Sequence, residues 1–237
     1  MNLLLLKDQE LLAPGQARVT DQRRIEHITR ILNAGVGDTL TVGQVNGPLG
    51  QGCIEYLNEN ELVLRLALKQ APPAPLPLTL VLGLPRPQQI KRILQTVASA
   101  GVKTLHLIQS RRVEKSYWQS PALAPEEIER QLHLGLEQGC DTVEPKVHFH
   151  PRFKPFAEDI LPTLMAEDPL ALVAHPYRAA PCPSHVKRPV MMAVGPEGGF
   201  IDFEVEHLKE KGFQAVHLGE RILKTETAIP FLLGRLF

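Results

Sequence analysis

The hydrophobic positions of the chain follow one pattern up to about residue 71 and a different pattern after residue 77. In the first part, short β-like runs alternate with turn residues, as in 39–45 and 62–68. One stretch, 22–32, instead has helical spacing. The sequence therefore predicts a small β-barrel over residues 1–71, interrupted by one helix. The residues that carry the helical spacing are Ile25, Ile28, Ile31 and Leu32.

The second pattern begins after a proline-rich segment. Residues 71–77 contain four prolines, so they fit neither a helix interior nor a central strand, and we expect a linker over 72–77. Beyond it, apolar strands alternate with amphipathic helices over 78–237, which predicts a mostly parallel α/β sheet covered on both faces. The expected strands are 78–84, 104–108, 170–174, 190–194 and 214–218, and the expected helices include 125–138 and 203–211, the latter capped by Asp202.

Composition and residue spacing argue against several classes of protein. The 237 residues carry 26 basic and 26 acidic side chains, and the hydrophobic content is 43%, the balance of an ordinary globular enzyme. The longest apolar runs are too short to span a bilayer. Three widely spaced cysteines without a Cys-x-x-Cys pair disfavour a disulfide scaffold, and we expect a reducing cytoplasm. His148 and His150 share a strand face, but without a carboxylate or cysteine at ligand spacing we expect no metal site.

Charge is distributed unevenly along the chain. Residues 62–113 contain eight basic residues and no acidic residue, whereas 116–147 contain six acidic residues and two basic ones. A basic surface that faces a polyanion is one interpretation. Basic side chains that pair with acidic residues from elsewhere in the fold are the other, and composition does not separate the two.

Two glycine-containing turns near the end of the chain carry the most specific chemistry. The buried strand 190–194 runs into Gly195-Pro-Glu-Gly-Gly-Phe200, and the strand 214–218 runs into a polar segment that ends at Ala228. Ligands of open α/β sheets bind at the carboxyl ends of the strands, so we expect one shared pocket. A tight structural turn is the alternative for the first segment, and a helix capped by Thr225 is the alternative for the second. The spacing matches neither a dinucleotide-binding nor a P-loop motif.

The two segments together resemble the RsmE family of the SPOUT superfamily. The matching residues are Gly195-Pro-Glu-Gly-Gly-Phe200 and, about twenty residues later, Leu218-Gly-x-Arg-Ile-Leu-Lys-Thr-Glu-Thr-Ala228, with 27–38 resembling the family's entry into its N-terminal domain. The resemblance implies a SPOUT-type α/β methyltransferase domain with a C-terminal trefoil knot, preceded by a small PUA-like RNA-binding β-barrel. It also implies methylation of N3 of a specific uridine in 16S ribosomal RNA with S-adenosylmethionine, by a homodimer.

Individual residues have expected roles, which come from the chemistry of methyl transfer for the catalytic residues, from the resemblance for the cofactor contacts and from charge for the RNA contacts. Arg221 is the candidate that stabilises the uridine anion, and Glu226 is the candidate general base; a surface salt bridge and a helix-terminus anion are their respective alternatives. Cofactor contacts, made mostly by backbone groups, are expected at Leu172, Gly195, Pro196, Glu197, Gly198, Gly199, Leu218, Gly219 and Leu223. The arginines expected to bind RNA phosphates are Arg23, Arg24, Arg30, Arg111 and Arg112.

Several positions depart from the residues usual in this family, including Ser99-Ala100-Gly101-Val102 and Pro230. Asn33 and Lys224 stand where arginine is usual, and Asp141 replaces a base with an acid. The cofactor segments are nearly intact, while positions expected to face RNA differ. Two alternatives to the uridine-N3 methyltransferase therefore stay open: a SPOUT methyltransferase with a different RNA target, and a non-catalytic ribosome-associated RNA-binding protein.

Overall fold

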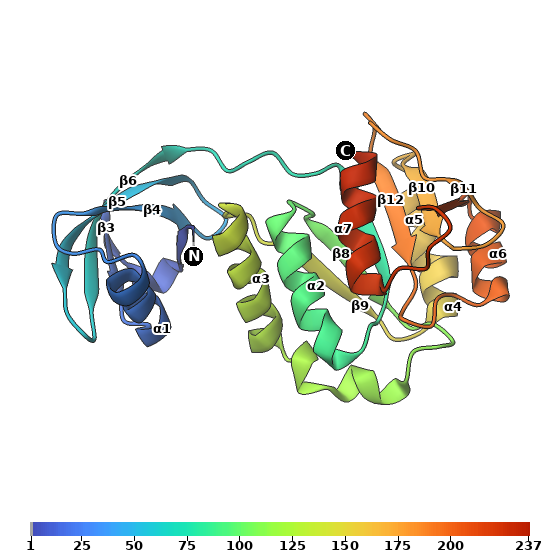
Figure 1. Cartoon of the computed structure of the whole chain (residues 1–237), viewed down its shortest axis with the longest axis horizontal. Helices are drawn as coiled ribbons and strands as arrows, with labels where there is room; N and C mark the ends of the chain where they lie inside the picture. The colour runs from blue at the N-terminus through green and yellow to red at the C-terminus, as the bar shows by residue number, and fades with distance from the viewer. Residues whose placement is uncertain (1) are drawn as a thin grey trace. The chain divides into compact units, whose positions relative to one another are not determined.

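The protein, described here as a computed structural model for residues 2–237, divides into two compact units. The first comprises Met1–Ala74 together with Leu132–Glu144, and the second comprises Pro75–Gln131 together with Pro145–Phe237. Figure 1 shows the elements of both units along the chain.

The first unit is built on a six-stranded sheet with the order β1-β4-β5-β6-β3-β2. Strands β1 and β4 pair in parallel, and the remaining neighbours are antiparallel. Residues of alternating positions along these strands, with Ile25 and Ile28, form a buried core. The elements are β1 (Leu4–Leu6), η1 (Asp8–Glu10), β2 (Leu11–Ala13), β3 (Gln16–Val19), α1 (Gln22–Glu26), η2 (His27–Ile31), β4 (Thr39–Gln44), β5 (Leu49–Leu57) and β6 (Leu62–Gln70).

The predicted strands 39–45 and 62–68 are confirmed as β4 and β6, apart from small differences at their ends. The predicted helix 22–32 is only partly regular. After α1 the backbone widens into the π-helical turn η2, where the amide of Leu32 donates to the carbonyl of His27 at 3.0 Å. The wider turn shifts the helical register, so Ile31 and Leu32 are 71% and 44% exposed instead of facing the core.

The segment 132–144 belongs to the first unit, although the predicted domain boundaries place it in the second domain. Polar contacts hold it there. The Thr142 hydroxyl donates to the Gly47 carbonyl at 2.6 Å, and the Glu144 amide donates to Asn46 Oδ1 at 2.9 Å. Such long-range contacts with a turn between two strands leave no periodic signal in the sequence.

The second unit contains a seven-stranded sheet in which every neighbouring pair is parallel, with the order β11-β13-β10-β12-β7-β8-β9. The predicted strands 104–108, 170–174 and 190–194 match β8, β10 and β12. The strands are β7 (Leu78–Gly83), β8 (Thr104–Ile108), β9 (Lys146–His150), β10 (Leu170–Ala174), β11 (Ala180–Pro181), β12 (Val190–Val194) and β13 (Gln214–His217).

Helices cover both faces of this sheet, which confirms the layered α/β prediction. Figure 1 shows α2 and α7 packed together, and α5 and α6 lie on the opposite face with an apolar core that includes Phe156, Leu161 and Phe200. Burial on both faces explains why the strands are continuously apolar. The helical segments from Pro87 onward are α2 (Pro87–Ser99), η3 (Lys115–Gln119), η4 (Pro121–Leu123), α3 (Pro125–Gly139), α4 (Phe153–Pro155), η5 (Phe156–Ile160), α5 (Leu161–Met165), α6 (Asp202–Glu210) and α7 (Thr225–Leu236). Of these, α3 belongs to the second unit only up to Gln131, and its remaining residues belong to the first.

Two predicted helix caps differ from the structure. Helix α6 has Ile201 at its N-cap, so Asp202 is the first helical residue and not the cap. Helix α7 has Lys224 at its N-cap, and the hydroxyl of Thr225 is used elsewhere. In both cases the helix begins one residue away from the predicted position.

Candidate functional site

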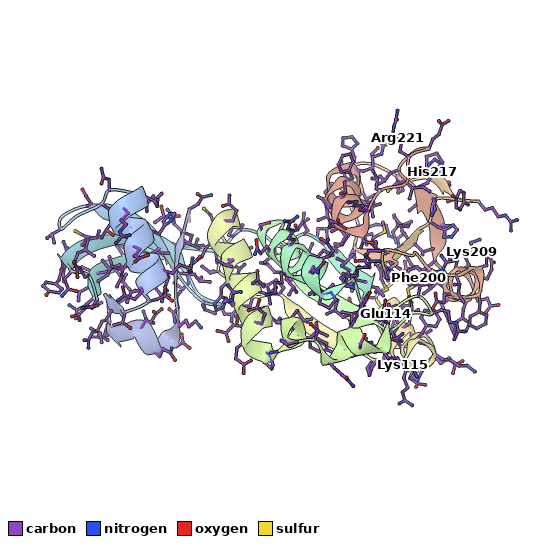
Figure 2. The ribbon with its side chains drawn as sticks, turned by 60° about the horizontal axis from the view of Figure 1, so that its bottom comes forward. Glu114, Lys115, Phe200, Lys209, His217 and Arg221 are labelled. Atoms are coloured by element: carbon purple, nitrogen blue, oxygen red, sulfur yellow. The ribbon has the colours of Figure 1, made fainter. Side chains whose placement is uncertain are left out.

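A pocket of about 430 Å³ lies in the second unit at the carboxyl ends of β10, β12 and β13. These strands are neighbours in the sheet, so the three loops that follow them converge on one edge. The lining includes the segments 174–177, 194–200, 216–219 and 221–223, together with the start of α7. Figure 2 shows His217 and Arg221 close together on this part of the molecule, with Phe200 further in. The predicted meeting of the two glycine turns is therefore present.

Backbone conformation and side-chain contacts fix the shape of the pocket. Gly199 and Gly219 have φ of +72° and +119°, a region that favours glycine, so their peptide groups can lie open to a ligand. The Thr225 hydroxyl donates to the Gly195 carbonyl at 3.3 Å, which links the start of α7 to the first glycine turn. This contact, and not helix capping, accounts for the threonine.

Most of the residues expected to bind the cofactor lie around this pocket. Leu172 does not: it is 1% exposed within β10, and Ala174 at the end of the same strand lines the pocket instead. The lining residues from the predicted set are Gly195, Pro196, Glu197, Gly198, Gly199, Leu218, Gly219 and Leu223.

The loop after β10 was not predicted as part of the site. His175, Pro176 and Tyr177 all line the pocket, and the ring Nδ1 of His175 lies 2.8 Å from the carbonyl oxygen of Tyr177. His217 plays a similar part in its own loop, since its Nδ1 accepts from the Gly219 amide at 3.0 Å. The sequence does contain one signal for this loop. The strand 170–174 is predicted beside 190–194 in a parallel sheet, so the loop after it ends at the same edge as the glycine turn.

The two predicted catalytic residues differ in their surroundings. Arg221 is exposed and lines the pocket. Glu226, the second residue of α7, is half-buried and is not a lining residue. Its Oε2 atom is buried without a hydrogen-bond partner among residues 2–237. Arg221 can therefore contact a ligand bound in the pocket, whereas Glu226 does not line the pocket.

Two of the arginines expected to bind RNA are engaged with carboxylates of the first unit. Arg24 is 7% exposed and pairs with Glu10, so its guanidinium is not presented to a phosphate, and the expectation for this residue is not supported. Arg23 is more exposed, with Nη2 at 3.3 Å from Glu137. Burial raises the pKa of Glu137, and the charge of Arg23 partly offsets this effect.

The other three predicted arginines are exposed. Arg30 lies in the π-helical turn of the first unit, and Arg111 and Arg112 lie in the loop after β8 in the second. Arg112 also lines the pocket and donates through Nη1 to the carbonyl of Gly198. Arg112 therefore stands at the pocket itself, in the basic stretch of the sequence.

A cluster of three imidazoles lies on the strands β8 and β9. His106 stacks on His148 with ring centroids 4.7 Å apart, and its Nδ1 is 2.9 Å from Nε2 of His150. Burial, followed by the two neighbouring rings, lowers the pKa of His106 to about 4. Within residues 2–237 no group of three histidine, cysteine or acidic side chains is arranged to hold a metal ion.

The pocket has the properties of a site for a nucleotide-sized ligand. Its volume falls in the usual range for small-molecule sites, and its lining combines apolar side chains with backbone groups and a few polar side chains. A ligand with a flat heterocycle and a charged chain would find both kinds of surface.

Comparison with known proteins identifies the family. The family model described as an RNA methyltransferase domain matches residues 72–236. The chain is 30% identical over 232 residues to ribosomal RNA small subunit methyltransferase E of Treponema pallidum, covering 96% of this chain and 87% of the relative. The chain belongs to the ribosomal RNA small subunit methyltransferase E family. Ribosomal RNA small subunit methyltransferase E 1 of Borreliella burgdorferi is 26% identical, over 96% and 94% of the two chains.

A solved structure of a family member shares the fold. Ribosomal RNA small subunit methyltransferase E of Neisseria gonorrhoeae, crystallised with S-adenosyl methionine, superimposes with a TM-score of 0.72 at 21% identity over 96% of this chain and 93% of that chain. In the described part of this chain, no helix is long and apolar enough to cross a membrane.

Proposed function

We propose that this protein uses S-adenosylmethionine to methylate N3 of a specific uridine in 16S ribosomal RNA. The observation that carries the proposal is the pocket where two glycine turns meet, with Arg221 on its wall, in a chain that belongs to the methyltransferase E family. The motifs of that family are the ones that line the pocket.

The residues present fit the methyl donor. Gly198, Gly199 and Gly219 keep side chains out of the places where backbone groups meet the ligand, and Leu218 and Leu223 offer apolar surface to an adenine ring. Glu197 is less available, because its Oε1 accepts from the Arg86 amide at 2.9 Å. We assign the donor to these residues and to the Tyr177 loop. When bound, the donor supplies an electrophilic methyl group.

The protein's remaining tasks are alignment of the uridine and management of one proton. Loss of the N3 proton leaves a negative charge that spreads onto the two carbonyl oxygens of the base. Arg221, exposed at the pocket, stabilises that charge. We keep Glu226 as the proposed general base; its Oε2 is buried and has no hydrogen-bond partner in the described chain, so this oxygen is free to accept a hydrogen bond from a substrate.

Methylation of purified small subunits and of bare 16S RNA tests the function. We expect transfer of one methyl group, which mass mapping places on a single uridine and which chromatography of the released nucleoside against a 3-methyluridine standard assigns to N3. Transfer to another nucleotide would support the alternative RNA target, and absence of both transfer and donor binding would support a non-catalytic RNA-binding protein.

The Arg221→Ala variant tests the assigned role within that activity. Removal of one stabilising donor lowers kcat by about 10²–10³-fold. We expect the affinity for S-adenosylmethionine to stay within about twofold, because backbone groups hold the donor. Arg152→Ala, an exposed arginine outside the pocket lining, is the matched control. Turnover of Arg221→Ala at the wild-type rate would show that the assignment is wrong.

We further propose that the domain organisation follows the family. Residues 1–71 form a PUA-like barrel that binds RNA, residues 72–77 link it to a SPOUT domain over 78–237, and the C-terminal segments form the trefoil knot. The six-stranded sheet with its enclosed core supports the barrel. The packing of the 218–224 segment beside the 195–200 turn supports the knot.

A homodimer in the cytoplasm completes the proposal. Two large apolar side chains, Ile222 beside the pocket and Phe231 on α7, are 70% and 60% exposed, which is consistent with a covering partner. The proposed substrate, ribosomal RNA, places the protein in the cytoplasm. Light scattering of the purified chain measures the oligomeric state directly.

A further inference from the structure

A buried carboxylate ties the loop after β8 to the start of α6. Glu204 is 3% exposed. Its Oε2 accepts from the Ile201 amide at 3.0 Å, and its Oε1 accepts from the Arg111 amide at 2.7 Å. Hydrogen bonds to a carboxylate are stronger than those between neutral groups, and an anion is also favoured in the first turn of a helix. Glu204 therefore anchors the backbone of Arg111.

The residue that follows this anchor reaches the pocket. Arg112 donates to the carbonyl of Gly198 and lines the donor pocket. Its side chain lies close against the turn, since a Cβ on Gly198 would be 3.0 Å from Arg112 Cδ. A carbonyl is neutral, so this contact orients the guanidinium without cancelling its charge.

We propose that Glu204 is a positioning residue: by holding the backbone of Arg111, it places the next residue, Arg112, at the mouth of the pocket to bind an RNA phosphate beside the target nucleotide. The inference rests on the proposed function. Both arginine side chains are exposed, and both lie in the basic stretch 62–113. The planar guanidinium fork matches a phosphate. Glu204 itself, being buried, acts only through the loop that it holds.

The Glu204→Gln variant separates positioning from donor binding. An amide offers one accepting oxygen where the carboxylate offers two, so the amide of either Arg111 or Ile201 loses its acceptor. We expect the KM for RNA to rise about tenfold, with kcat and the affinity for S-adenosylmethionine within twofold of wild type. Loss of one phosphate contact also lowers the salt dependence of RNA binding by about 0.7–0.9 in the log–log slope.

Glu206→Gln is the matched control, because Glu206 lies on the same helix, is exposed and pairs with Lys209 at 2.8 Å. We expect it to behave as wild type in every measurement. An Arg112→Ala variant supplies the second test: it should raise the KM for RNA to a similar extent, and adding Glu204→Gln to it should change little more.

Three results would overturn the proposal: an unchanged KM for RNA in Glu204→Gln, an equal loss of donor affinity, or fully additive effects in the double variant. If Glu204→Gln does not fold, Arg112→Ala decides alone, since an unchanged KM for RNA contradicts the role of the loop. A wild-type protein that transfers no methyl group refutes the proposed function instead. In that case filter binding of 16S RNA still measures the predicted difference between the variants.

Discussion

Replacement of Gly195 by alanine tests whether the first glycine turn must keep its present shape to bind the methyl donor. A Cβ at this position would lie 2.7 Å from the Phe200 amide nitrogen and 2.8 Å from the carbonyl carbon of Gly199. Both neighbours are backbone atoms, so no side-chain rotation relieves the overlap. The turn has to open, and with it the pocket wall that it forms.

The size of the effect follows from the cost of inserting a methyl group into a filled space, about 1–3 kcal/mol. If the whole cost is lost from binding, affinity for S-adenosylmethionine falls about 5- to 150-fold, because 1.4 kcal/mol corresponds to a factor of ten. If it is lost from folding, the melting temperature falls by about 2–4 °C for each kcal/mol. Calorimetric titration and thermal unfolding of the same sample measure both.

Gly234→Ala is the matched control for this change. Gly234 lies in α7, and among the described residues no atom outside the helix's own backbone and the adjoining residues lies within 4 Å of the methyl group that alanine would add there. Alanine is favoured over glycine in a helix by about 1 kcal/mol, so this variant should be as stable as wild type or more so. A Gly195→Ala protein with wild-type affinity and wild-type melting temperature would refute the reasoning.

Two further predictions concern stability. Arg24→Ala should lower the free energy of unfolding in urea by about 3–5 kcal/mol, because it leaves Glu10 without its buried partner. The control Arg30→Ala, at an exposed position, should stay within about 0.5 kcal/mol of wild type. Equal effects of the two changes would contradict the buried pair. Burial and two neighbouring histidines hold the pKa of His106 near 4, below the ordinary value of 6.5, so on acidification the unfolded chain takes up a proton that the folded chain does not. Stability should therefore fall by about 2 kcal/mol more between pH 7.5 and 5 in wild type than in His106→Gln, and equal pH dependence would refute this.

The strands of the second unit were predictable because a strand buried on both faces is apolar at nearly every position. Residues 190–194 are apolar at every position, and the strand has the predicted limits. The pocket was predictable to the same degree, since 190–194 and 214–218 each end in a polar glycine turn. The contribution of His175 was not, because no residue near it departs from an ordinary loop composition.

The fate of the charged residues was harder to predict. Arg24 lies on a predicted amphipathic helix and resembles a solvent-facing base, yet it is buried against Glu10. Its partner is 14 residues away in the chain, in a short 3-10 turn that has no periodic signature. Lys91 similarly pairs with Glu127 at 2.7 Å, so part of the basic stretch is balanced by the acidic one. Whether a basic residue faces a polyanion or pairs with an acidic residue depends on tertiary contacts.

The order of strands in the parallel sheet has a consequence for how the protein forms during synthesis. Strand β7 has its outer partner β8 within the next thirty residues or so, but its inner partner β12 pairs Val190 with Leu78, across more than half of the second unit. Parallel pairing between such distant segments is slow, because a long loop has to close before any contact rewards it. On the ribosome, the backbone N–H and C=O groups along one edge of β7 therefore stay unpaired until residues 190–194 have been made, and that edge is where chaperones would be needed.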